Sequence, residues 1–252
     1  MKDISVIIAA RMGSSRFKGK ILSNLHGKPL LYRLIERVKY SQYIDDIILA
    51  TTNNPEDDLL EDFCLKNSIS CYRGSADDVL LRLKEAAVKS GKKNILEILG
   101  DNPLIHSEII DTCINKYFSC EAEYLATATN EYPYLINTHK LFPIGIRVQV
   151  FSLKTLLKCE SLAKEKNYRE HATMFIAENP KIFNSIFLEA KGNFEKYNRP
   201  NLTFAVNYEE NLKLINYIYS KNYIINKNFS ILDAINTFDK NQKLKNLMYP
   251  LN

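Results

Sequence analysis

The feature that most constrains the fold is a pattern repeated four times in the first part of the chain: a short apolar run, then a loop, then a helical segment. The apolar runs cover residues 4–9, 47–50, 70–72 and 95–99. Their length and β-branched content are typical of strands that are covered on both faces. Repeats of strand, loop and helix predict an α/β fold with a doubly wound, mostly parallel sheet.

Helical periodicity is clearest after the first run, where apolar residues share one face, namely Leu30, Leu31, Leu34, Ile35 and Val38. Further helices are expected from residue 55 and over residues 77–89. The second half is less regular, with expected strands at 124–128, 144–150, 182–188 and 202–206 and expected helices at 152–166, 169–178, 209–219 and 231–248. We interpret this half as a small mixed subregion of a single domain spanning residues 1–252, because no linker marks a boundary.

The composition favours a small anionic substrate. The net charge of +5 comes from 34 basic and 29 acidic residues without a long basic block, so we expect no nucleic-acid partner. The five cysteines form no Cys-x-x-Cys pair, which predicts free thiols in a reducing compartment. Because no run of about 18 apolar residues is present, we expect a cytoplasmic protein that does not bind a membrane.

The loop that follows the first apolar run combines glycine with positive charge. Gly13 and Gly19 allow backbone amides to turn toward one point, and the basic residues around it are Arg11, Arg16, Lys18 and Lys20. Such a loop suits a polyphosphate, and it follows a strand end, where ligands bind in open α/β sheets. Its spacing matches neither the Walker pattern nor the dinucleotide fingerprint. The alternative is an ordinary basic surface loop.

Asp101 is the acidic residue best placed for chemistry. It follows an apolar run and Gly100 and precedes Pro103, which stiffens the turn. A carboxylate in this place would bind Mg²⁺ beside phosphates held by the first loop. The alternative is an aspartate that caps a helix or a turn. Asn207 ends a later expected strand, so it also lies where strands deliver site residues.

Seven segments, in order along the chain, carry a resemblance to a known family. They are residues 10–20, 27–30, 73–80, 100–105, 145–152, 169–173 and 204–210. In this order they resemble the cytidylyltransferase family, most closely the branch named after spore-coat polysaccharide biosynthesis, which is related to 3-deoxy-manno-octulosonate and acylneuraminate cytidylyltransferases. Several motifs in register are far more specific than any single one.

The resemblance implies a Rossmann-like nucleotidyltransferase fold and the transfer of CMP from CTP to a sugar acid or related acidic or phosphorylated metabolite, with release of pyrophosphate, for a surface glycan. It implies a CTP-binding half at about residues 1–120, an acceptor-binding half at about 121–252, Mg²⁺ as cofactor and a homodimer. The catalytic residues would be Arg11, Arg16, Lys20 and Asp101. The nucleotide would also contact Ala9, Ala10, Gly13, Ser14, Arg73 and Ser75.

Two departures from the family concern the metal and the acceptor. Family members commonly carry an aspartate where this chain has Asn207, and an amide binds Mg²⁺ more weakly; Asp101 and Asn207 are the expected metal ligands. Arg147 and Gln149 stand where relatives often have acids, and Arg147 would suit a carboxylate or phosphate on the acceptor. Its alternative is an ion pair at a subunit contact.

Arg169 and His171 are the other residues expected to bind the acceptor, and His171 could also accept a proton. The alternative for His171 is a hydrogen bond within the fold. Two rival functions remain open: a sugar-1-phosphate nucleotidyltransferase that uses another nucleotide, and a nucleotide-binding protein that no longer turns over. The sequence does not identify the acceptor, because no short motif encodes such a pocket.

Overall fold

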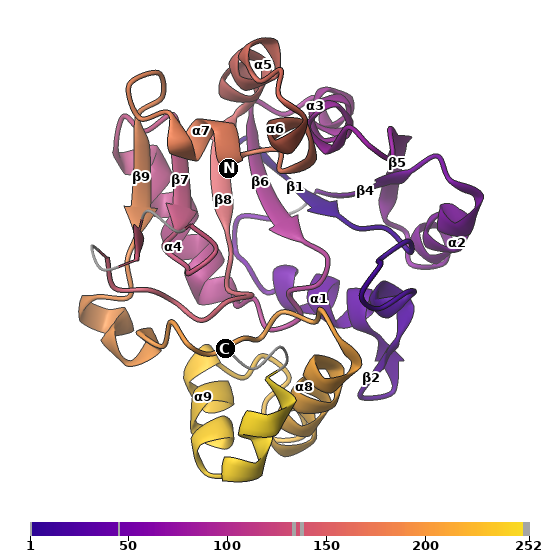
Figure 1. The fold of residues 1–252 in the computed structure, drawn as a ribbon, viewed down its shortest axis with the longest axis vertical. Coiled ribbons are helices and arrows are strands. Elements are labelled where there is room, and N and C mark those ends of the chain that lie inside the picture. The colour runs from indigo at the N-terminus through magenta and orange to yellow at the C-terminus, as the bar shows by residue number, and fades with distance from the viewer. Residues whose placement is uncertain (1, 45, 133–134, 137–138, 249–252) are drawn as a thin grey trace.

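The computed structural model describes residues 2–44, 46–132, 135–136 and 139–248, which are built around a seven-stranded sheet (Figure 1). The strand order is β5-β4-β1-β6-β8-β7-β9. Four strands of the first half run parallel: β1 (Ile4–Ala9), β4 (Ile47–Thr52), β5 (Ser70–Gly74) and β6 (Asn94–Leu99).

The second half of the chain extends the same sheet. β7 (Tyr124–Thr127) and β9 (Ser185–Leu188) pair in parallel, whereas β8 (Gln149–Ser152) lies antiparallel between β6 and β7. A separate two-stranded sheet joins β2 (Asn24–Leu25) and β3 (Lys28–Pro29). The predicted α/β fold with a mostly parallel sheet is confirmed.

Helices cover both faces of the sheet because β1 directs alternate apolar side chains to opposite sides. Val6 and Ile8 belong to the core beneath α1 (Leu30–Val38) and α4 (Ser107–Ser119). Ile7 belongs to the opposite core, beneath α3 (Val79–Ser90) and α5 (Leu153–Leu162). Near the C-terminus, α8 (Glu209–Asn222) and α9 (Ile231–Asp239) pack against each other at the lower end of the molecule (Figure 1).

The strand order creates a crevice at the carboxyl ends of β1 and β6. After β1 the chain continues to β4 and β5 on one side and then crosses to β6 on the other, so the connections leave β1 and β6 in opposite directions. Ligands bind at such a switch point in open α/β sheets. The two strand ends stay close, since the amide of Gly100 donates to the carbonyl of Ala9 at 2.9 Å and a Cβ at Gly100 would lie 2.7 Å from that of Ala10.

The strand predictions were least accurate in the second half. The strand expected at 144–150 is limited to β8, and residues 202–206, all of them described, form only an isolated bridge between Thr203 and Ile144. The two segments run in parallel and come very close at Gly145, whose φ is +90° and where a Cβ would lie 2.4 Å from the amide nitrogen of Ala205. A glycine with this conformation and close approach interrupts a regular ladder.

The helix predictions failed in three places. α4 was not predicted. The helix expected at 169–178 is divided into α6 (Lys166–Glu170) and α7 (Met174–Glu178), with Thr173 between them bonded to the buried Gln149 at 2.5 Å. The helix expected at 231–248 ends at Asp239, and the 3-10 helix η5 (Gln242–Leu247) follows it, with the side chain of Asn241 accepting a bond from the first turn. Among the described helices, none has both the length and the apolar character needed to cross a bilayer.

Candidate functional site

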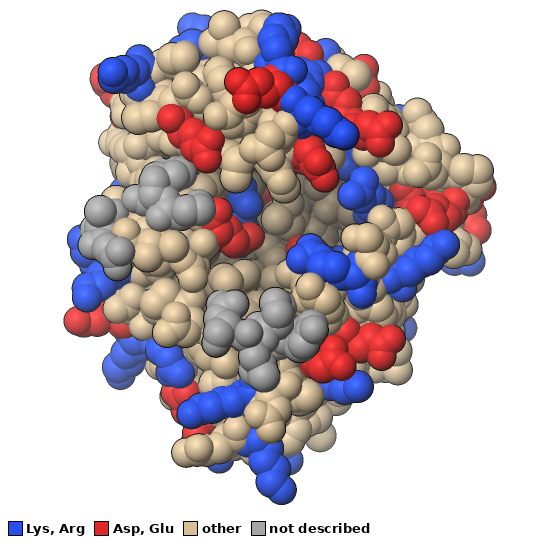
Figure 2. Space-filling view, in the orientation of Figure 1, with Lys and Arg blue, Asp and Glu red and all other residues tan. Residues whose placement is uncertain are grey.

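A cavity of about 470 Å³ lies at the carboxyl ends of β1 and β6. Its lining comes from the loop after β1, the turn after β6, α3 and the end of α6. The surface is hollowed there, and Lys and Arg side chains border the hollow (Figure 2). The structure brings eight of the predicted site residues to this cavity, namely Ala9, Ala10, Arg11, Ser14, Arg16, Lys20, Asp101 and His171.

Asp57 holds the loop after β1 in place. This buried residue ends the 3-10 helix η2 (Pro55–Asp57), and its carboxylate accepts bonds from the amides of Met12 at 2.7 Å and Thr52 at 3.0 Å. The Met12 carbonyl in turn accepts from the amides of Ser14 and Gly19, each at 2.9 Å. Because a buried carboxylate must be hydrogen-bonded, the loop geometry is tied to the core. Sequence reasoning missed Asp57.

Gly13 lies in the same loop, against η2. A Cβ at this residue would lie 2.3 Å from Glu56 Oε1. The position therefore accommodates the side chain of Glu56 at close range. The predicted contact between the Gly13 backbone and a nucleotide stays a prediction.

Lys20 and Asp101 meet at the floor of the cavity, and Asn207, which is not among the residues that line it, is bonded to Lys20 there. Lys20 is 6% exposed, and its Nζ donates to Asp101 Oδ2 at 2.7 Å and to Asn207 Oδ1 at 3.2 Å. The residue before Asn207 is fixed to the same turn, since the amide of Val206 donates to the carbonyl of Asp101 at 2.8 Å. Residues far apart in sequence thus converge through one ammonium group.

Arginine side chains supply further positive charge. Arg11 and Arg16 are exposed at the cavity, and the Arg16 guanidinium lies 5.7 Å from the centre of the Tyr208 ring. Arg82 of α3 also lines the cavity, although it is only 3% exposed. Burial, followed by the charge of Arg11, lowers the pKa of Arg82. Sequence reasoning missed Arg82; an arginine between Leu80 and Leu83 on the apolar face of α3 was the available signal.

Arg73 and Ser75 lie outside the set of residues that line the cavity. Arg73 forms ion pairs with Asp58 at 2.6 Å and Glu61 at 2.9 Å, and it donates to the carbonyl of Thr52 at 3.0 Å. It therefore joins β5 to α2 (Asp58–Lys66). The hydroxyl of Ser75 accepts from the amide of Asp78 at 3.0 Å at the start of α3. The structure does not bring either side chain to the other predicted nucleotide contacts.

Arg169 is likewise engaged inside the fold. Its guanidinium donates to Asp78 Oδ2 at 2.5 Å and to Glu160 Oε1 at 3.2 Å. These ion pairs hold α6 against α3 and α5, so Arg169 positions the end of α6 instead of lining the cavity. His171 follows α6 and does line it, together with Glu170.

A buried polar network contains the other two residues predicted to bind the acceptor. Gln149 on β8 donates from Nε2 to Glu97 Oε2 at 2.8 Å. Its carbonyl oxygen accepts from side chains at 2.5 to 3.0 Å, those of Tyr124, Tyr132, Arg147 and Thr173. Burial raises the pKa of Glu97, and the charge of Arg147 opposes that rise. Arg147 and Gln149 do not line the cavity, and their contact with an acceptor stays a prediction.

The oxygens of Asp101 and Asn207 suit a hard cation, because both already point at one positive group, the Lys20 ammonium. Oxygen donors are those that Mg²⁺ prefers. Together they provide two donors and a single negative charge. Within the described ranges, no group of three His, Cys, Asp or Glu side chains could hold a metal ion.

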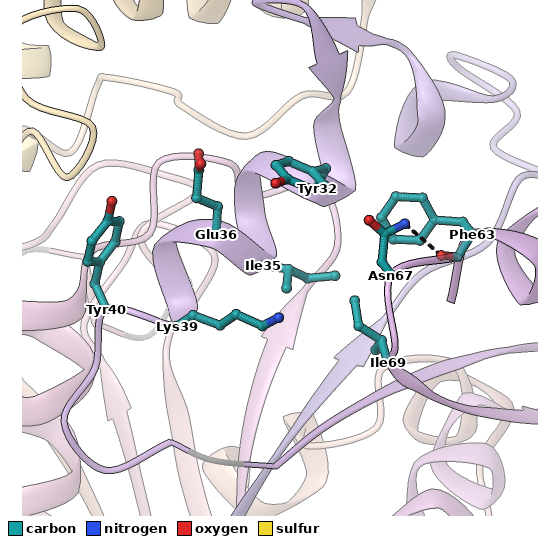
Figure 3. Close-up of a pocket in the computed structure, with 8 residues that line it drawn as sticks. All are labelled: Tyr32, Ile35, Glu36, Lys39, Tyr40, Phe63, Asn67 and Ile69. Carbon is teal, nitrogen blue, oxygen red and sulfur yellow. Dashed lines mark hydrogen bonds between the residues drawn. The ribbon is translucent and has the colours of Figure 1, made fainter. Parts of the chain in front are cut away.

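A second hollow lies between α1 and α2 (Figure 3). Tyr32, Ile35, Phe63 and Ile69 give it an apolar wall, and Lys39 and Glu36 bring one charge of each sign. Asn67 beside them donates to the carbonyl of Phe63 at 2.7 Å. This balance of charge does not suit a polyphosphate, in contrast to the arginines and the lysine of the cavity at β1 and β6, which we take as the candidate active site.

The chain is similar to known proteins in both sequence and fold. A family model described as cytidylyltransferase matches residues 5–246. The chain is 31% identical over 226 residues to the spore coat polysaccharide biosynthesis protein SpsF of Bacillus subtilis, covering 88% of each chain. It is 33% identical over 126 residues to a 3-deoxy-manno-octulosonate cytidylyltransferase of Chlamydia pneumoniae, covering 48% of each. A solved cytidylyltransferase from Leptospira borgpetersenii superposes with a TM-score of 0.86 at 26% identity, covering 99% of this chain and 98% of the other.

Proposed function

The chain belongs to the cytidylyltransferase family and is a nucleotidyltransferase, and from this premise we propose that it transfers CMP from CTP to an acidic acceptor with release of pyrophosphate. The acceptor we propose is a sugar acid or a sugar phosphate destined for a surface glycan. The relatives named for polysaccharide biosynthesis and for 3-deoxy-manno-octulosonate support this choice.

The observation that carries the proposal is a set of cations without carboxylate partners around one cavity. Within the described residues, Arg11, Arg16 and Arg82 form no ion pair, although each lines the cavity. Clustered positive charge that is not paired with carboxylates is costly, so a ligand that brings negative charge is favoured. A triphosphate supplies that charge and accepts the hydrogen bonds of guanidinium groups.

The reaction then needs little more than positioning and charge neutralisation. A hydroxyl oxygen of the acceptor attacks the α-phosphorus of CTP, a new P–O bond forms, and the bond to the β-phosphate oxygen breaks. Pyrophosphate leaves with the electron pair, and the hydroxyl proton passes to solvent or to a neighbouring base. His171, exposed at the cavity, is in a position to accept it.

Mg²⁺ fits the oxygens of Asp101 and Asn207, and when bound it would neutralise charge on the phosphates. This chain's own residues would do the remaining work. Arg11 and Arg16 bind the triphosphate from the open side, and Arg82 binds it from the wall formed by α3. Lys20 fixes the Asp101 carboxylate at the floor.

The test is pyrophosphate release with CTP, UTP, GTP and ATP, each with Mg²⁺ and a panel of 3-deoxy-2-keto sugar acids and sugar phosphates. We expect release with CTP and one class of acceptor. Release with another nucleotide would replace CTP in the proposal. CTP binding without release across the panel would favour the rival, a nucleotide-binding protein that no longer turns over.

Asp101→Asn tests the site itself. We expect the metal-dependent rate to fall by about 100-fold or more, because the Asp101 carboxylate at the floor loses its charge. The matched control is Asp77→Asn, an exposed aspartate that does not line the cavity. Undiminished turnover of Asp101→Asn would remove this residue from the site.

A further inference from the structure

The floor of the cavity contains a cation of its own. The ammonium of Lys20 lies between Asp101 Oδ2 and Asn207 Oδ1, at 2.7 and 3.2 Å. The Lys20 side chain is 8% exposed and that of Asp101 is 22% exposed. A lysine ammonium donates three hydrogen bonds and seldom gives up water without compensation, so these two oxygens hold it in place.

The charges of the three groups cancel. Lys20 contributes one positive charge, Asp101 one negative charge and Asn207 none, so the floor is neutral as it stands. An aspartate in place of Asn207 would leave one negative charge in excess. The amide therefore changes what the floor attracts, because a divalent cation gains from an excess negative charge and not from a compensated ion pair.

The backbone around Asn207 is held beside Lys20. The backbone amide of Asn207 donates to Asn211 Oδ1 at 3.1 Å, at the first turn of α8, and the amide of the preceding residue donates to the carbonyl of Asp101. These backbone bonds place residue 207 next to the Asp101 turn, where Asn207 Oδ1 accepts from the Lys20 ammonium. Within the described residues, no three His, Cys, Asp or Glu side chains gather into a group that could hold a metal ion.

We propose that the Lys20 ammonium occupies the cation site in the nucleotide-free protein and that Asn207 is its positioning residue. A divalent ion then binds only together with the nucleotide. The third point rests on the proposed function, because the phosphates of the nucleotide would supply the missing negative charge. The first two concern the nucleotide-free protein and are independent of turnover.

Binding of Mn²⁺ alone to the nucleotide-free protein tests the proposal, with free Mn²⁺ followed by its electron paramagnetic resonance signal. We expect weak binding to the wild type and binding about tenfold tighter or more to Asn207→Asp, where one negative charge is added. Asn201→Asp adds the same charge at an exposed position outside the cavity and should leave Mn²⁺ binding unchanged. Lys20→Met should also tighten Mn²⁺ binding, since it frees both oxygens.

Tight binding of Mn²⁺ by the nucleotide-free wild type, or equal binding by wild type, Asn207→Asp and Lys20→Met, would overturn the proposal. In a second arm, CTP is added to the wild type, and we expect Mn²⁺ to become protein-bound. If CTP neither recruits Mn²⁺ nor raises the melting temperature, the proposed function fails, while the first arm still decides the role of Lys20. If CTP raises the melting temperature without recruiting Mn²⁺, the claim of joint entry is wrong.

Discussion

Two sets of arginines in this molecule use their charge in opposite ways. Around the cavity between β1 and β6, Arg11, Arg16 and Arg82 form no ion pair with another described residue. In the second half, Arg147 interacts with Glu131 and Gln149, and Arg169 pairs with Asp78, which caps α3, and with Glu160 on α5. The first arrangement leaves charge for a ligand, whereas the second uses charge to hold the fold together.

This contrast decides which arginines are expected to contribute to binding and which to stability. Both sets are basic residues within or near motifs that resemble the same family, so sequence alone treats them alike. Only the partners of each guanidinium distinguish them. The following predictions test that distinction, beginning with the largest expected effect.

Arg147→Met should destabilise the protein by about 3 to 5 kcal/mol, because it leaves the buried carboxylate of Glu97 without its neighbouring cation. The cost should grow with pH. Burial already raises the pKa of Glu97, and removing Arg147 raises it further, so stability is lost as pH rises from the unfolded value near 4.5 through the folded one. Urea unfolding at acidic and at alkaline pH measures the change.

The double variant Arg147→Met with Glu97→Gln provides the control for this effect. An amide at residue 97 carries no charge, so the double variant should regain stability at alkaline pH relative to Arg147→Met alone. Equal stability of the two variants across the pH range would show that the pair is not coupled. The predicted contact between Arg147 and the acceptor would then be favoured over a role in stability.

The second prediction concerns His106, which joins the first half to the C-terminal helices. Its Nδ1 accepts from the amide of Glu108 at the start of α4, and its Nε2 lies 3.2 Å from the carbonyl of Asn228. Burial lowers the pKa of His106 to about 4. The folded state therefore disfavours the proton, and stability is lost as pH falls below about 6.5, where the unfolded histidine becomes charged.

His106→Asn should remove this dependence, since asparagine still accepts the capping bond of α4. Between about pH 7 and pH 5, the wild type should lose about 2 kcal/mol more stability than the variant. Urea unfolding at the two pH values gives the comparison. Parallel losses in both proteins would show that His106 titrates normally in the folded state.

The sequence predicted well what is encoded locally. β1, its basic loop and Asp101 lie within or beside short motifs, and the structure assembles them at one switch point. The missed helix α4 was also readable, because Ile109, Ile110 and Cys113 already follow helical spacing. That miss was an omission and not a physical limit.

The buried polar network around Gln149 could not be predicted from the sequence, for a physical reason. Gln149 binds Glu97 and Thr173, which lie 52 and 24 residues away in the sequence. No local pattern encodes contacts between such distant residues. The same holds for Asp57, whose role depends on its distance from Met12 in space, 45 residues away in the chain. Sequence periodicity identifies elements and leaves the partners of buried polar groups undetermined.

The third prediction compares two arginines of the same motif region. Arg82→Met should raise the CTP concentration needed for half-maximal activity about 10-fold or more, through loss of charge-assisted hydrogen bonds. Arg73→Met is the matched control, because Arg73 pairs with α2 outside the cavity. It should change the CTP requirement little and cost about 1 kcal/mol of stability at most. A larger CTP effect for Arg73→Met than for Arg82→Met would reverse the assignment drawn from their partners.

The smallest effect is expected at His171, where the two halves meet. This residue is exposed at the cavity and follows α6, which Arg169 fixes by ion pairs. His171→Asn keeps a polar group of similar reach but cannot accept a proton near neutral pH. If the residue only contacts the acceptor, the acceptor KM should rise a few-fold while the pH profile keeps its shape. If it accepts the proton, kcat should fall and the dependence of the rate on pH should change. A variant with unchanged KM, kcat and pH profile would show that His171 neither contacts the acceptor nor accepts its proton. The acceptor would then have to bind through groups outside this cavity.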